Sequence, residues 1–238
     1  MKPEQRDTTK LTISKIVHEL GVYWLVSKDH TNWPQTSQIL ILKAINKNSI
    51  AVEKQSFFLD KTTELLERYI ELLNRLRLRG KSISVEETYG STFNNPAPIT
   101  ETWSFRGAAD IVVFEKDGAV IWDAKWSWSP EKLNQNQIAL YATVHEIVLK
   151  QPVKQIGFIV FGPQKIVTFN FGKQQREETI EKMNSVTKKI IRNEFTPQPE
   201  ETRCKYCDYA GYCKYKVEGD KANGDTGELE ASRVVHNE

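Results

Sequence analysis

The sequence predicts an α/β fold, because segments with a helical spacing of apolar residues stand on both sides of a run of short β-prone segments. Hydrophobic residues make up 39% of the 238 residues and charged residues 27%. This composition supplies enough apolar material for a core and differs from that of disordered or collagen-like chains. We therefore expect a folded globular protein that is large enough to be an enzyme.

Helical patterns open the chain. Thr12 to Lys28 has apolar residues at helical spacing, and residues 58–78 trace one long apolar face that Gly80 follows as a stop. Residues 36–44 fit either a helix or a strand, and periodicity alone leaves both open. We expect an N-terminal helical region over residues 1–80, and further helices at residues 134–150 and 177–192.

The period of the apolar residues changes after Gly80. Asp117-Gly118 separates two apolar runs and is typical of a hairpin turn. Gly162-Pro163 separates a second pair of runs. These segments predict a core domain over residues 81–195, with strands at residues 82–89, 109–114, 119–125, 156–161 and 166–171.

The last part of the chain has a different character. Residues 196–215 are expected to form a cysteine segment, which opens with a linker that contains Pro197 and Pro199. Residues 216–238 lack periodicity and predict a disordered acidic tail. The net charge of +2 neither requires nor excludes a nucleic-acid partner. No apolar run is long enough to span a membrane and the first ten residues are polar, so we expect a cytoplasmic protein without a membrane partner.

Carboxylates and a lysine form the strongest chemical pattern. Alternate residues of a strand share a face, so Asp123 and Lys125 project to the same side. If the flanking strands form a hairpin, Asp110 converges on both. Two carboxylates suit Mg²⁺ or Mn²⁺, and a lysine beside them can orient or deprotonate a nucleophile. The alternative is an ordinary ion pair on an edge strand with Asp110 in a turn.

The order of these motifs resembles a known family. Gly-Ala-Ala-Asp110, twelve residues and Asp123-Ala-Lys125 resemble the PD-(D/E)XK nuclease superfamily, and Gln137 with Tyr141 resembles the Q-x-x-x-Y motif of its RecB-like branch. The resemblance implies a restriction-endonuclease-like core, with a central mixed sheet flanked by helices. In isolation, Gln137 and Tyr141 equally fit an amide and an aromatic ring on a half-buried helix face.

The resemblance also implies roles for these residues. Asp110 and Asp123 would be ligands of Mg²⁺ or Mn²⁺, with the carbonyl of Ala124 as a third. Lys125 would lie beside the nucleophile. Gln137 and Tyr141 would lie at the substrate and complete the set of catalytic residues.

The family commonly places a metal-binding histidine and a glutamate on a helix before the sheet. The helix expected at residues 60–78 contains no histidine, and Thr63 and Glu67 fit the pattern best. Glu67 is therefore the expected additional metal ligand, with Glu64 a weaker candidate. An ordinary solvated helix face explains both glutamates equally well.

The three cysteines of the chain form a C-x₂-C-x₅-C cluster at Cys204, Cys207 and Cys213. Three thiolates at this spacing suit an iron–sulfur cluster or zinc. The segment resembles the C-terminal trio of the CRISPR-associated RecB-like and AddB-type exonucleases, which implies a [4Fe–4S] cluster completed by an N-terminal cysteine.

The fourth cysteine is absent from this chain. The corresponding position falls near Val22, and the nearest alternative ligands are His18 and His30. A cysteine and histidine zinc site, or a segment without metal, are the other interpretations.

The leading hypothesis is a metal-dependent DNA nuclease, expected to act as an exonuclease on single-stranded DNA or DNA ends in recombination, repair, or phage or CRISPR DNA processing. The alternative is a catalytically weak nuclease-fold module that binds DNA or protein and keeps a structural metal cluster. A small zinc-binding nucleic-acid adaptor is a third hypothesis. Protein partners or an oligomer are compatible with each.

Overall fold

The computed structural model describes residues 9–28, 30–90, 95–126, 133–194, 196–205, 207 and 209–217. The chain forms two compact units, Met1–Lys188 and Lys189–Glu238. The first unit therefore joins the N-terminal helical region to the sheet that follows it. Most of the expected acidic tail, residues 218–238, lies outside the described residues.

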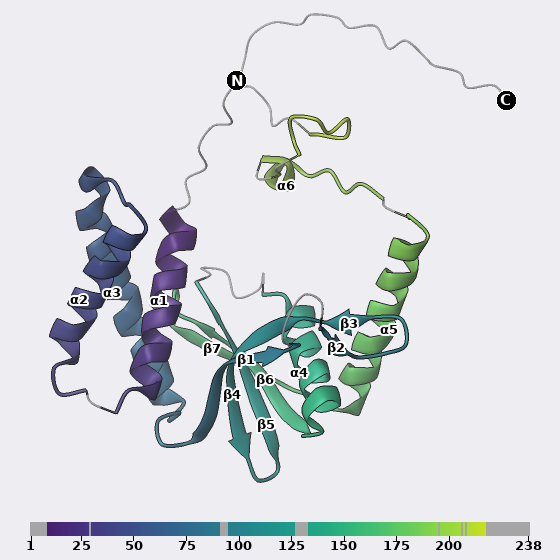
Figure 1. The fold of residues 1–238 in the computed structure, drawn as a ribbon, viewed down its shortest axis with the longest axis horizontal. Helices are drawn as coiled ribbons and strands as arrows, with labels where there is room; N and C mark the ends of the chain where they lie inside the picture. The colour runs from purple at the N-terminus through teal and green to yellow at the C-terminus, as the bar shows by residue number, and fades with distance from the viewer. Residues whose placement is uncertain are drawn as a thin grey trace, which may run out of the picture. The chain divides into compact units, whose positions relative to one another are not determined.

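Helices α1 (Thr9–Val26), α2 (Trp33–Lys47) and α3 (Val52–Arg75) open the described part of the first unit (Figure 1). Residues 36–44, whose periodicity fits either a helix or a strand, are helical and belong to α2. A proline in the first turn favours that start, and Ile41 and Ile45, one turn apart, are buried. The predicted helices before and after this segment in the chain are confirmed as α1 and α3, although α3 begins six residues earlier than expected.

The described strands form a mixed five-stranded sheet in the order β1-β4-β5-β6-β7. Strands β5 and β6 are parallel, and the other neighbours are antiparallel. The predicted hairpin is confirmed between β4 and β5, where Gly118 takes a φ of 140° that L side chains rarely adopt. The strands are β1 (Ser82–Tyr89), β4 (Gly107–Glu115), β5 (Gly118–Lys125), β6 (Val153–Val160) and β7 (Lys165–Asn170).

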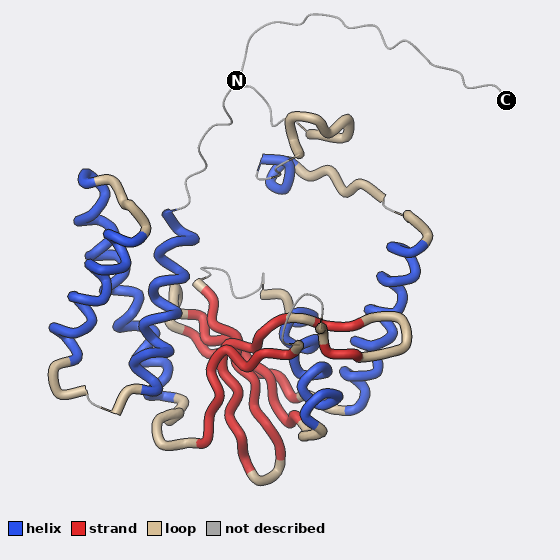
Figure 2. The backbone as a smooth tube through the Cα atoms, viewed as in Figure 1, coloured by secondary structure: helices blue, strands red, loops and turns tan. Residues whose placement is uncertain are grey.

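A core lies on each face of the sheet. Helices α1, α2 and α3 cover one face, which we call the helical-layer face, and α4 (Gln135–Leu149) covers the other (Figure 2). Strand β5 is buried on both sides, with Trp122 in the first core and Ile121 in the second. A continuous apolar run is what such a central strand requires. The described helices include none that is long and apolar enough to cross a membrane.

Short elements complete the described fold. Strands β2 (Ala97–Pro98) and β3 (Ser104–Phe105) pair with each other, and α6 (Glu201–Lys205) belongs to the second unit. Helix α5 (Lys173–Ile191) has no buried residue. It is tied to the first unit by the Arg176–Glu146 ion pair at 2.8 Å. We did not expect β2, β3 and α6 from the sequence, because such short elements carry no periodic pattern.

The close approach of β5 and β6 gives a stability prediction. A Cβ atom on Gly157 would lie 2.4 Å from Cζ3 of Trp122 and 2.7 Å from the carbonyl oxygen of Val167. Because both Gly157 and Trp122 are buried, neither can move aside. Gly157→Ala should therefore lower the free energy of unfolding by about 1–3 kcal/mol in urea titrations.

Gly172→Ala is the matched control, because its Cβ would come no nearer than 3.6 Å to another residue. It should leave the unfolding midpoint unchanged. A Gly157→Ala protein as stable as the parent would contradict this account of the packing.

Candidate metal centre

The centre of the site is a gap between two paired strands. Pairing of β4 with β5 stops at Ile111 and Trp122. Beyond that point the backbone N–H of Ala124 donates to Oδ2 of Asp110 at 2.7 Å. The Asp110 side chain thus takes the place of a strand-to-strand hydrogen bond, and its carboxylate is held in the gap.

The strand register brings further carboxylates to this gap. In the β1–β4 register, Val85 pairs with Ile111 and Glu87 pairs with Ala109, so Glu86 lies opposite Asp110. Continuation of the β4–β5 register places Asp123 opposite Asp110 on its other side. Glu86, Asp110 and Asp123 therefore form a row across β1, β4 and β5. We call this row the carboxylate row.

Asp123 and Lys125 lie on one face of β5, as their spacing predicts. Nζ of Lys125 is 2.8 Å from Oδ2 of Asp123, whose side chain is only 2% exposed. Trp122 and Ala124 point to the helical-layer face, where they pack in the core formed with α1, α2 and α3, which we call the helical-layer core. The ion pair therefore lies on the side of the sheet that α4 covers.

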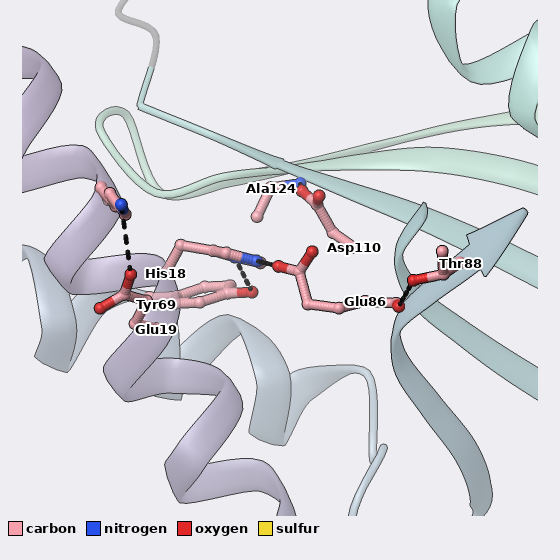
Figure 3. A network of polar contacts seen from close by, with 8 residues as sticks. His18, Glu19, Tyr69, Glu86, Thr88, Asp110 and Ala124 are labelled. Carbon is pink, nitrogen blue, oxygen red and sulfur yellow. Dashed lines mark hydrogen bonds and ion pairs between the residues drawn. The ribbon is translucent and has the colours of Figure 1, made fainter. Parts of the chain in front are cut away.

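His18 of α1 joins the carboxylate row from the other side. Its Nε2 atom is 2.8 Å from Oε1 of Glu86, and ligand atoms of His18, Glu86 and Asp110 all lie within 4.8 Å of one another (Figure 3). Within the described part of the chain, no other three His, Cys, Asp or Glu side chains meet this criterion. The structure thus supplies a helix histidine beside Asp110.

The structure places both glutamates that were considered as helix ligands on α3. Glu67 lies on α3 but is exposed and does not belong to the group of His18, Glu86 and Asp110. Glu64 pairs instead with Lys61 at 2.8 Å and with Arg68 at 2.6 Å. The family pattern favours α3 because this helix directly precedes the sheet, whereas α1 carries the histidine that reaches the carboxylate row.

Tyr69 is the residue that α3 contributes to this region. Its side chain is fully buried, and its hydroxyl lies 3.5 Å from Nδ1 of His18. The ring fits against α1 because residue 21 is glycine; a Cβ there would lie 2.3 Å from the ring. Burial and the charges of the carboxylate row raise the pKa of Tyr69 well above its usual value, so the phenol remains neutral.

Burial and mutual repulsion shape the charges of the site. Burial, followed by the charge of Asp110, raises the pKa of Asp123 to about 6. Burial also raises the pKa of Asp110, against the lowering effect of His18. For Lys125, burial lowers the pKa, but the charge of Asp123, its hydrogen bond and the charge of Asp110 together outweigh burial, and the net shift is upward. Lys125 is therefore held as a cation.

The donor set fits a hard divalent cation. Carboxylate oxygens are the preferred ligands of Mg²⁺ and Mn²⁺, and an imidazole nitrogen is also accepted by first-row metals. Repulsion between partly buried carboxylates is relieved when a cation lies between them. His18, Asp110 and Asp123 thus have both the chemistry and the electrostatic need for such an ion.

Gln137 and Tyr141 lie on α4. They are one turn apart and half-buried, and Nε2 of Gln137 is 3.4 Å from the Tyr141 hydroxyl. Tyr141 contributes to the raised pKa of Lys125, which places it near the ion pair. The ring of Phe105, from β3, packs edge-on against it with centroids 6.0 Å apart.

The cysteines belong to the second unit. All three are free thiols; Cys204 is half-buried, and Cys207 and Cys213 are exposed. Their sulfur atoms are not gathered within 4.8 Å. Both candidate histidine ligands make contacts inside the first unit, since His18 contacts Glu86 and Nε2 of His30 contacts the carbonyl of Ser27 at 2.8 Å.

Comparison with known proteins places the chain in a family. The model of the PD-(D/E)XK nuclease superfamily matches residues 26–214. The chain therefore belongs to this superfamily, and the expected restriction-endonuclease-like α/β fold is confirmed. The matched region contains Asp110, Asp123 and Lys125, but it begins after His18.

The other comparisons give no closer assignment. The chain matches none of the curated proteins. A solved structure described as the crystal structure of SSO0001 is similar at 15% identity and a TM-score of 0.41, with 90% of this chain and 98% of that chain covered.

The raised pKa of Asp123 predicts a pH dependence with a definite sign. The folded carboxyl keeps its proton up to about pH 6, whereas an unfolded aspartate releases it near pH 4. The metal-free protein should therefore lose stability, on the order of 2 kcal/mol from this group, as pH rises from about 4 to about 6. Thermal unfolding in EDTA across this range measures the effect.

Asp123→Asn isolates the contribution of this group, because an amide does not titrate. The stability of the variant relative to the parent should increase as pH rises from about 4 to about 6. Parallel stability curves for the two proteins would show that the pKa of Asp123 is not raised.

Proposed function

We propose that this protein is a deoxyribonuclease that depends on Mg²⁺ or Mn²⁺ and hydrolyses phosphodiester bonds at DNA ends or in single strands. The observation that carries the proposal is the approach of His18 to Asp110 at the gap between β4 and β5, with Asp123 opposite Asp110 in the register and paired with Lys125. Membership of a nuclease superfamily supports a nucleic-acid substrate.

Each residue of the site has a proposed role. His18, Asp110 and Asp123 would bind the cation, together with the carbonyl of Ala124. When bound, the cation would activate water and neutralise charge on the phosphate. Glu67 is exposed on α3 and does not belong to the group of His18, Glu86 and Asp110.

Lys125 would act as a cation rather than as a base. Because Asp123 and Asp110 raise its pKa, its ammonium group can donate hydrogen bonds to the attacking water and stabilise charge on the scissile phosphate. Hydrolysis adds the water oxygen to phosphorus and breaks one P–O ester bond, which leaves a phosphate and a hydroxyl end. Gln137 and Tyr141, on the same side as Lys125, would contact the substrate strand.

The placement of His18 also bears on the alternative function. The hypothesis of a catalytically weak binding module rested on the absence of a helix histidine, and His18 supplies one from α1. Action on DNA ends in recombination, repair, or phage or CRISPR DNA processing is part of the proposal. It is supported by the Gln137 and Tyr141 pair and by the resemblance of the cysteine segment.

Single substitutions at the site test the proposal. His18→Ala, Asp110→Asn, Asp123→Asn and Lys125→Met should each reduce Mn²⁺-dependent cleavage by a factor of about 100 or more, on the order of 3 kcal/mol in the barrier. Cleavage of end-labelled single-stranded, linear double-stranded and circular DNA, with Mn²⁺ or EDTA, measures the rate and separates exonuclease from endonuclease action.

His30→Ala and Glu67→Ala are the matched controls, because His30 lies in the connection between α1 and α2, Glu67 is exposed on α3, and neither belongs to the site. They should cleave like the parent. Parental activity in a folded Asp110→Asn or Asp123→Asn protein would exclude this site as the catalytic centre.

We also propose that the cysteine segment binds metal, as a [4Fe–4S] cluster or as zinc. A turn hydrogen bond joins two of the cysteines, from the N–H of Cys207 to the carbonyl of Cys204 at 3.2 Å. The backbone N–H of Val217 lies 3.5 Å from Sγ of Cys204, a contact of the kind that supports metal-bound thiolates. With three thiolates available, one further ligand would complete either site.

Metal analysis of anaerobically purified protein decides between these ions. An iron–sulfur cluster predicts iron and sulfide in near-equal amounts and a brown colour, whereas zinc predicts a colourless protein with one zinc ion. Cys207→Ser should lose the metal, while Asp110→Asn should retain it. Protein that contains neither metal, together with an unchanged melting temperature for Cys207→Ser, would contradict the proposal.

A further inference from the structure

Glu86 has an unusual backbone for a residue inside a strand. Its φ angle is 52°, in the left-handed region that non-glycine residues rarely adopt. Among the described non-glycine residues, the others with such angles follow a helix or lie in the turn between β6 and β7, and are Ser49, Arg77, Lys150, Gln164 and Asn193. Among the described non-glycine residues with a left-handed backbone, Glu86 is therefore the one that lies inside a strand.

The interruption reverses the direction of the Glu86 side chain. Ile83 and Val85 pack in the helical-layer core, so regular alternation would turn residue 86 to the opposite face. Instead, the carboxylate of Glu86 reaches His18 of α1 on the helical-layer side (Figure 3). The left-handed backbone is what brings this carboxylate to the site.

The same interruption opens the strand pairing at Asp110. Val85 pairs with Ile111 and Glu87 pairs with Ala109, but no pair joins Glu86 to Asp110 between them. The carbonyl oxygen of Glu86 accepts a hydrogen bond from Oγ1 of Thr88 at 3.0 Å. Asp110 is thus released from regular pairing on its β1 side as well as on its β5 side.

The separations match adjacent ligands of one cation. Nε2 of His18 and Oε1 of Glu86 are 2.8 Å apart, and ligands in neighbouring positions of an octahedral Mg²⁺ or Mn²⁺ site lie about 3 Å apart. The Glu86 side chain is 57% exposed, so its carboxylate has room to adjust. An oxygen of the half-buried Asp110 completes the group from the sheet.

We propose that Glu86 is an additional ligand of the divalent cation held by His18 and Asp110. The inference rests on the proposed function, because it assumes that a cation binds at this site. It goes further in assigning a ligand on β1, outside the D…D-x-K motif. A purely structural ion pair with His18 would not account for the strained backbone, since a pair whose carboxylate side chain is 57% exposed stabilises a fold little.

Mn²⁺ titration calorimetry on the full chain, without DNA, tests this ligand directly. Glu86→Gln keeps the size of the side chain and removes its charge, and should weaken Mn²⁺ binding about tenfold or more. Glu87→Gln is the matched control, since residue 87 pairs regularly with Ala109 on the same strand. It should bind Mn²⁺ like the parent.

The backbone argument has its own test. Glu86→Gly and Glu86→Ala both remove the carboxylate, but only glycine adopts a φ of 52° without strain. In EDTA, the glycine variant should melt at a higher temperature than the alanine variant, although alanine is normally preferred over glycine in strands. Ser49→Gly, at an exposed position with the same φ angle, should also raise the melting temperature while leaving Mn²⁺ binding unchanged.

The outcomes separate the two proposals. If the parent binds Mn²⁺ and Asp110→Asn does not, the metal site stands; parental affinity in Glu86→Gln would then overturn the inference about Glu86 alone. A parent that binds no Mn²⁺ would overturn the proposed function itself. An alanine variant at least as stable as the glycine variant would overturn the role assigned to the left-handed backbone.

Discussion

The hydrogen bond from the Ala124 backbone to the Asp110 carboxylate is the interaction on which the site depends. It replaces strand pairing where β4 and β5 separate, and it fixes a carboxylate inside the sheet rather than on either face. Residues from both faces can then meet at one point. His18 and Glu86 approach from the helical-layer side, while Asp123 and Lys125 lie on the side of α4.

This arrangement concentrates negative charge in a row that runs from the exposed Glu86 to the buried Asp123. Glu86, Asp110 and Asp123 stand in a row, and the pKa values of both aspartates are raised. Lys125 compensates part of this charge from one side, and the row remains a favourable position for a cation. The metal-free fold therefore keeps a repulsion that a binding site requires and that a purely structural sheet would avoid.

The helical layer has a functional as well as a structural part. Helices α1 and α3 bury the face of the sheet, and they also bring His18 and Tyr69 to the carboxylate row. Gly21 permits this contact by leaving room for the Tyr69 ring, although glycine is a poor helix former. Local helix stability is thus given up at a position where two helices must approach closely near the site.

The sequence by itself determined the local features of this protein. Alternation fixed the common face of Asp123 and Lys125, the Asp-Gly turn fixed the hairpin, and helical spacing put Gln137 and Tyr141 on one side of α4. Each depends on residues a few positions apart, where strand and helix periods dictate direction. The motif order likewise indicated the nuclease superfamily, which the family comparison confirmed.

Only the tertiary structure decided which distant residues complete the site. His18 shows no distinguishing pattern within α1, and its approach to Asp110 follows from how α1 and α3 pack together on the sheet. The family pattern therefore favours Glu67 on α3, the helix that directly precedes the sheet in the chain. Glu86 carries no local signal for a left-handed backbone, because glutamate normally avoids one. Periodicity reports which face a residue shares with its neighbours, whereas a site assembled from α1, β1, β4 and β5 depends on long-range packing.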